Sequence, residues 1–137
     1  SIPAGTKMIN MQMAGVSFSS GATELCIQIG DSGGYETSSY LGRTSDHSGS
    51  MAALSNAFQM TNGGDGSHVY HGQAILTLED SSDYTWTGFW VLGRSDGANG
   101  YIGAGSKSLS AELDRVQLTT TGGSNTFDAG VVNISYI

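Results

Sequence analysis

The sequence predicts an all-β fold, an antiparallel two-sheet β-sandwich of the jelly-roll type. Three observations favour it. Short runs alternate apolar and polar side chains with a period of two, as half-buried strands do. Glycine is frequent, with 21 residues among 137, whereas proline occurs once, which is typical of many tight turns between strands. Only residues 51–58 show mild helical character, enough for a single turn.

The expected strands follow this alternation along the chain, and glycine- and serine-rich turns separate them. In residues 7–13 the odd-numbered apolar side chains share one face, and in residues 24–30 the odd-numbered apolar side chains face inward. Loops are expected at residues 42–50, 61–67 and 105–108. The other expected strands are residues 35–41, 57–60, 69–79, 85–94 and 101–104.

The last segment, Leu113 to Ile137, is expected to form two strands and their connection, and to be central to the fold. In the first strand Val116, Leu118 and Thr120 share one face. In the second, Val132, Ile134 and Tyr136 alternate with Val131, Asn133 and Ser135. The whole chain, residues 1–137, is predicted to be one domain, with residues 1–6 as a linker or boundary segment.

Charge and cysteine content exclude several classes of function. The formal net charge is −7, and the five basic residues are scattered, whereas nucleic-acid binding requires clustered positive charge. No apolar run approaches the roughly 20 residues of a membrane span, so membrane insertion is not expected. Cys26 is the only cysteine, so stability must come from core packing or oligomerisation rather than from an intrachain disulfide.

The final segment DRVQLTTTGGSNTFDAGVVNISYI (residues 114–137) resembles the C-terminal β-sandwich domains of bacteriophage and prophage tail fibres and related virion appendages. The resemblance extends to LCIQIGDSGGYETSSY (residues 25–40) and GRSDGANGYIGAGSKSLSAELDRV (residues 93–116). Residues 41–70 match weakly.

This resemblance implies a non-enzymatic virion protein, synthesised in the host cytoplasm. Its most direct implication is the distal receptor-binding domain of a tail fibre, a homotrimer that contacts other virion proteins and a host-surface glycan or protein. One alternative is a structural or decoration module of the capsid or fibre, with a role in assembly and stability. Another is a free-standing carbohydrate-binding module.

Aromatic and loop residues are the candidates for ligand binding. Tyr84, Trp86 and Tyr101 lie on or beside one aromatic-rich strand and could stack on sugar rings, whereas Trp90 is assigned to the core. Loops on a rigid scaffold often carry recognition, which favours residues 42–50 and 62–68. These two loops supply the candidates Asp46, His47, Asp65 and His68.

The remaining motifs favour structural interpretations. GDSGG at residues 30–34 matches the motif around a protease nucleophile, but all three histidines follow Ser32, so it is interpreted as a turn. His68 and His71 are weak candidates for ligands of one metal ion, because residues three apart on a strand face opposite sides. No cofactor is expected. Calcium is the best candidate ion, at the turns that hold Glu79, Asp80 and Asp83, or Asp96 and Asn99. Arg115, next to Asp114, is expected to pair with an acid on an adjacent strand or subunit.

Overall fold

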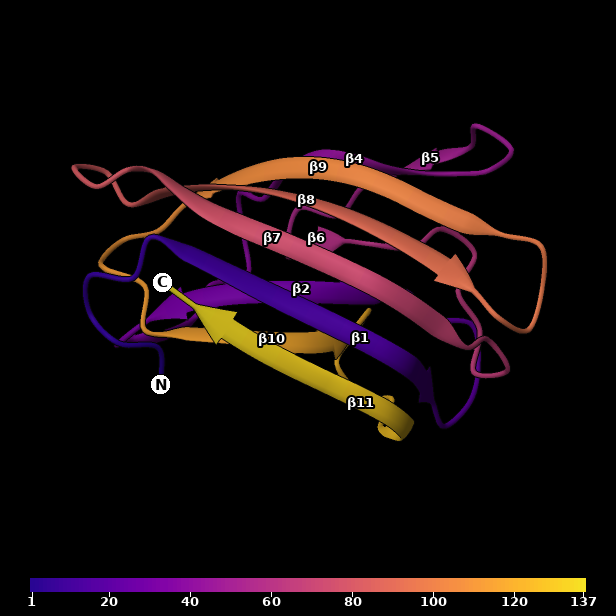
Figure 1. Cartoon of the computed structure of the whole chain (residues 1–137). Helices are drawn as coiled ribbons and strands as arrows, with labels where there is room; N and C mark the ends of the chain where they lie inside the picture. Colours follow the sequence, from indigo (N-terminus) through magenta and orange to yellow (C-terminus); the bar gives the residue numbers. More distant parts are fainter.

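The computed structural model describes residues 1–137 and contains eleven β-strands and no helix, hence no helix that could span a membrane. The strands form two antiparallel sheets that face each other, so the predicted β-sandwich is confirmed (Figure 1). The strands are β1 (Met8–Phe18), β2 (Leu25–Asp31), β3 (Gly34–Tyr35), β4 (Leu41–Asp46), β5 (Met51–Ala52), β6 (Phe58–Gln59), β7 (Tyr70–Asp80), β8 (Thr85–Arg94), β9 (Gly100–Ser108), β10 (Arg115–Thr120) and β11 (Phe127–Tyr136).

The larger sheet has seven strands in the order β11-β1-β7-β8-β9-β4-β5, and β7, β8 and β9 form a meander at its centre. The smaller sheet contains β10-β2-β3, with β6 also paired to β2. Asp96 lies in the β8–β9 turn and accepts a hydrogen bond from Val69 N at 2.7 Å, which ties this turn to the start of β7.

The core lies between the sheets and contains 21 buried hydrophobic residues. The period of two that identified the strands also identifies their buried faces. On β2, Leu25, Ile27 and Ile29 are fully buried, and on β8 every even-numbered residue from Trp86 to Leu92 is buried. The predicted inward face of β2 is therefore confirmed.

Trp90 is a central core residue, as the sequence predicted. Its indole Nε1 donates a hydrogen bond of 3.1 Å to Thr44 Oγ1, and the Thr44 hydroxyl donates to the Met60 carbonyl at 3.0 Å. The indole lies against Gly103 on the neighbouring β9, where an added Cβ would stand 2.5 Å from the ring. Glycine at this position gives the indole the space it needs.

The structure corrects the expected elements in the middle of the chain. Residues 42–50, expected as a loop, include most of β4, and residues 42–46 pair with β9. Residues 51–58 contain no helical turn, and residues 105–108 belong to β9 rather than to a loop. Many glycine and serine side chains made these segments resemble loops, but hydrogen bonding between strands places them in the sheet.

The two C-terminal strands do not pair with each other, and they are not central. β10 is the edge of the smaller sheet, and β11 is the edge of the larger sheet beside β1 (Figure 1). The pairing of β11 with β1 contains a bulge. Gly130, at this bulge, adopts a φ of 94°, and a Cβ added to it would stand 2.4 Å from the Gly15 carbonyl oxygen. The glycine of the TFDAG segment is thus required by backbone geometry.

Candidate functional site

The aromatic residues predicted to stack on a ligand are placed in or against the core. Trp86 is 2% exposed and Tyr101 is 3% exposed, because both side chains occupy the inner face of the larger sheet. They lie toward opposite ends of β8, since Tyr101 pairs with Leu92. Tyr84 is half-buried against the core and has a positive φ of 54° in the β7–β8 turn. The expected aromatic platform on this strand is therefore absent.

The predicted loop residues lie at one end of the larger sheet, where their polar atoms bond within their own turns. Asp46 Oδ1 accepts hydrogen bonds from Ser48 N at 2.9 Å and from Ser50 N at 3.0 Å. Asp65 Oδ1 accepts from the backbone N–H and the hydroxyl of Ser67, both at 2.9 Å. These hydrogen bonds hold the pKa of each carboxyl group below its ordinary value.

The two candidate histidines at this end also have protein partners. His47 Nδ1 lies 2.7 Å from Asn99 Oδ1, and His68 Nδ1 lies 3.2 Å from the Tyr70 hydroxyl. The structure thus brings the two predicted loops to the same end of the sheet. It does not direct their side chains toward a shared hollow.

The other motifs form local structure. GDSGG makes the turn from β2 to β3, in which Asp31 Oδ1 accepts from Gly33 N at 2.8 Å, so the interpretation as a turn is confirmed. His71 bonds to Gly15 N and Ser95 Oγ, away from the partner of His68. Asp80 accepts hydrogen bonds from Ser82, and no three His, Cys, Asp or Glu side chains gather to hold a metal ion.

Arg115 pairs with its sequence neighbour rather than with an acid on another strand. Its Nε donates to Asp114 Oδ1 at 2.7 Å. Its guanidinium also lies over the ring of Tyr35, 5.8 Å from the centroid. The predicted pairing with an adjacent strand is therefore wrong, and β3 supplies an aromatic partner instead.

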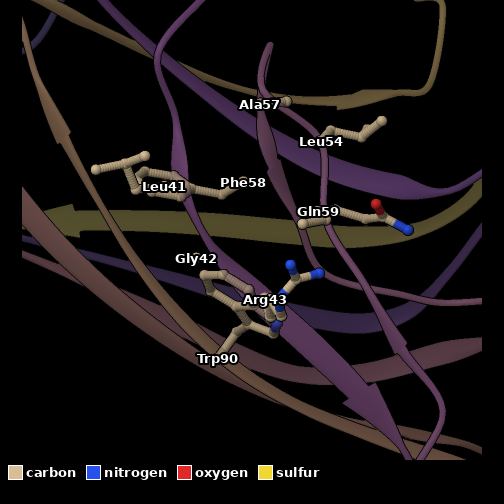
Figure 2. A pocket seen from close by; sticks show the side chains of 9 residues that line it. Leu41, Gly42, Arg43, Leu54, Ala57, Phe58, Gln59 and Trp90 are labelled. Atoms are coloured by element: carbon tan, nitrogen blue, oxygen red, sulfur yellow. The ribbon is translucent and has the colours of Figure 1, made fainter.

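One hollow lies beside the buried face of Trp90. Figure 2 shows it between β4, which carries Leu41 and Arg43, and the segment that carries Leu54, Ala57 and Gln59. Its volume is about 10 Å³, which is room for about one water molecule. This hollow is too small to be a ligand site.

A larger hollow lies on the outer face of the smaller sheet, and we call it the small-sheet groove. Its volume is about 360 Å³, within the range of small-molecule sites. β2 and β10 form its floor, and the segments around residues 37 and 54–57 and the turn after β10 form its sides. The groove is lined by Cys26, Gln28, Thr37, Leu54, Asn56, Ala57, Gln117, Thr119, Thr120, Thr121, Gly122 and Gly123.

A chain of amide hydrogen bonds crosses the floor of the groove. Gln117 Nε2 donates to Gln28 Oε1 at 2.8 Å, and Gln28 Nε2 donates to the Asn56 carbonyl at 2.8 Å. Gln28 and Gln117 are opposite each other in the β2–β10 register, which explains why their amides meet. The two amides are thereby held in fixed orientations.

Several polar groups of the groove have no protein hydrogen-bond partner. They are the side-chain oxygen of Gln117, the side-chain amide of Asn56, and the hydroxyls of Thr37, Thr119 and Thr120, of which the Thr120 hydroxyl is buried. Amides and hydroxyls both donate and accept hydrogen bonds, as the hydroxyls of a sugar do. The arrangement therefore suits a ligand with many neutral hydroxyl groups.

No charged side chain lines the groove, although the molecule carries a formal net charge of −7. The one titratable group is the Cys26 thiol, and burial raises its pKa to about 12, so the thiol is neutral at physiological pH. The groove therefore lacks the carboxylate pair that glycoside hydrolysis uses.

One aromatic side chain lies next to the groove. Tyr35 is 38% exposed, and its register with Gly30 and Arg115 places it on the same outer face as Gln28 and Gln117. Thr37 lines both the groove and the adjoining hollow that contains Tyr35. The structure thus offers an exposed aromatic ring at a different place from the one predicted.

The sequence analysis missed the groove residues. Its period-of-two pattern had assigned Gln28, Gln117 and Thr119 to outer faces, and that signal was correct. The pattern could not show that β2 and β10 are neighbours, since they are more than 80 residues apart in the chain. Nor could it place Asn56, because a loop position has no periodicity.

Comparison with protein-family models, with curated proteins and with solved structures gives no match for this chain.

Proposed function

We propose that the chain is a non-enzymatic binding domain that holds a neutral glycan in the small-sheet groove. The observation that carries this proposal is an uncharged groove of about 360 Å³ lined by residues with unpaired amide and hydroxyl groups. The fixed orientation of Gln28 and Gln117 reduces the side-chain entropy that the protein would lose when a ligand binds. Tyr35, at the end of the same face, would stack on a second sugar unit.

The sequence resemblance to tail-fibre domains supports a more specific proposal. In a phage appendage, the domain would present the groove at the distal end and bind a glycan of the host surface. Several copies on one appendage would raise the avidity of individually weak sites.

The experiment is a glycan array probed with the labelled chain, followed by titration of the best ligand. The double variant Gln117→Ala with Asn56→Ala is expected to lose on the order of tenfold in affinity, because it removes unpaired groups that bind sugar hydroxyls. The matched control is Gln12→Ala with Asn133→Ala, which removes an amide pair from the larger sheet's outer face. An array without any bound glycan, or equal affinities for the two double variants, would contradict the proposal.

A second candidate is a structural module that packs against another virion protein. Phe89, Val91 and Ile102 are 50–64% exposed on the outer face of the larger sheet, and Val91 pairs directly with Ile102. Apolar patches of this kind are common at protein interfaces. The glycan array distinguishes the two candidates, since this one predicts an empty array.

A further inference from the structure

The edge strand β11 is unusual because it is long, exposed and apolar. Its inner-face residues Val132, Ile134 and Tyr136 pair with the buried Met13, Met11 and Ile9 of β1, in that order. The three β11 side chains are nevertheless 37–48% exposed. The smaller sheet does not extend far enough to cover them. The opposite edge of the larger sheet is β5, which has only two residues.

The backbone groups of β11 alternate between β1 and the open edge. Ile137 and Met8 exchange both of their hydrogen bonds, each 3.0 Å long. Because these groups alternate along an antiparallel strand, Ser135 and Asn133 also face β1. Val132, Ile134 and Tyr136 therefore direct their N–H and C=O groups to the open edge.

An open row of donors and acceptors specifies another β-strand as the partner. Natural edges are usually protected by charged side chains, proline or short length. From residue 129 to residue 137, β11 and the residue after it carry neither a charged side chain nor proline. This neutral segment is also where two copies of a molecule with a net charge of −7 could approach with little repulsion.

We propose that β11 pairs antiparallel with β11 of a second copy of this chain, in a two-fold dimer centred on Ile134. In this register Ile134 faces its own copy, and Val132 faces Tyr136 of the other molecule. Each of these residues has free backbone N–H and C=O groups that face the partner strand. The two strands can therefore form a continuous set of hydrogen bonds with each other. The same register places Val132, Ile134 and Tyr136 of both molecules on one shared inner face, where the apolar side chains of one molecule pack beside those of the other.

The first test is the solution mass of the full chain by light scattering over a range of concentrations. A dimer of about twice 14.2 kDa is expected, and Ile134→Lys should return it to 14.2 kDa. Ile102→Lys, at a more exposed position on another strand, is the control and should stay dimeric. A wild-type monomer at all concentrations would overturn the proposal, and so would a trimer that persists in Ile134→Lys.

A second measurement keeps the proposal testable if one variant fails to fold. In the wild-type dimer, the amide hydrogens of Val132, Ile134 and Tyr136 should exchange slowly, and dilution to the monomer should make these three exchange quickly. The amides of Asn133 and Ser135, bonded to β1, should stay protected in both states. Fast exchange at residues 132, 134 and 136 at high concentration would overturn the proposal.

The register has its own test. A mixture of Ile134→Lys with Ile134→Glu places opposite charges at the centre of the pair and should recover the dimer mass. A mixture that stays monomeric would overturn the register centred on Ile134.

Discussion

At the scale of single residues, some buried polar groups are held by specific partners. Thr44 is fully buried, and its hydroxyl forms hydrogen bonds with two buried polar groups. It accepts one from the Trp90 indole N–H and donates one to the Met60 carbonyl. A buried donor without an acceptor is costly, so this hydroxyl matters more than its size suggests.

Thr44→Val tests this role, since valine keeps the shape and removes the hydroxyl. The indole N–H of Trp90 and the Met60 carbonyl would both lose a partner, and we expect the free energy of unfolding to fall by about 1–3 kcal/mol. Urea denaturation followed by tryptophan fluorescence measures the change. Thr87→Val, at an exposed position of β8, is the control and should cost much less. Equal stability of the wild-type chain and Thr44→Val would contradict the assigned role.

At the scale of elements, one carboxylate fixes the loop that follows β6. Glu24 lies just before β2, and its two oxygens accept hydrogen bonds from Gly63 N, Gly64 N and the Thr61 hydroxyl, at 2.7–3.0 Å. A segment rich in glycine would otherwise have many accessible conformations. Glu24 therefore gives residues 61–64 a defined course.

We expect Glu24→Ala to release this loop while the sheets remain folded. Hydrogen exchange should become faster at Gly63 and Gly64, and stability should fall by about 1.5–3 kcal/mol because the lost bonds involve a charged acceptor. Exchange followed by mass spectrometry measures the local effect. Glu79→Ala, on the exposed side of β7, should leave the exchange of the loop unchanged. If both variants gave the same exchange in the loop, Glu24 would not be its anchor.

Elements also show what the sequence could predict. Alternation located β1, β2, β7 and β8 and the inward face of β2, because successive side chains of a strand point to opposite faces of its sheet. It failed at β4, where glycine and short polar side chains resembled a loop. It also failed to show that the C-terminal strands belong to different sheets, because pairing between distant strands leaves no signal in a single sequence.

The candidate site was harder to predict for the same reason. Sequence analysis favoured Trp86 and Tyr101 as stacking residues, since aromatic side chains are conspicuous, but core packing requires both. The groove instead depends on Gln28 and Gln117, which are unremarkable in sequence and become a pair only when β2 meets β10.

At the scale of the whole molecule, hydrogen-bonded carboxyl groups determine the stability in acid. In Glu36, desolvation raises the pKa, but hydrogen bonds from Lys107 and Ser110 outweigh it, and the net pKa is lowered. Lys107 is itself buried and also donates to the Ser108 carbonyl at 2.7 Å. Hydrogen bonds also lower the pKa values of Asp31, Asp46, Asp65, Asp80, Asp96 and Asp114.

The sign of the pH dependence follows from these shifts. Because each folded-state pKa lies below the unfolded value, the stabilisation is present above the unfolded values of 3.8 for Asp and 4.5 for Glu. It is lost as the pH falls through the folded values. We expect the unfolding temperature to be steady near neutral pH and to fall below about pH 4.5. The unfolding temperature of Glu36→Gln should fall less steeply in acid than that of the wild type. The unfolding temperature of Glu79→Gln should change with pH as that of the wild type does. Equally steep losses of unfolding temperature in acid for the wild type and Glu36→Gln would contradict this role of Glu36.

Binding of a neutral glycan in the small-sheet groove can be observed in an NMR titration of the labelled chain with the best ligand from the array, which follows every backbone and side-chain amide. We expect the side-chain amides of Gln28, Asn56 and Gln117 to shift together, with those of Gln12 and Asn133 unchanged. Shifts confined to the loops around Asp46 and Asp65, or to the outer face of the larger sheet, would contradict it.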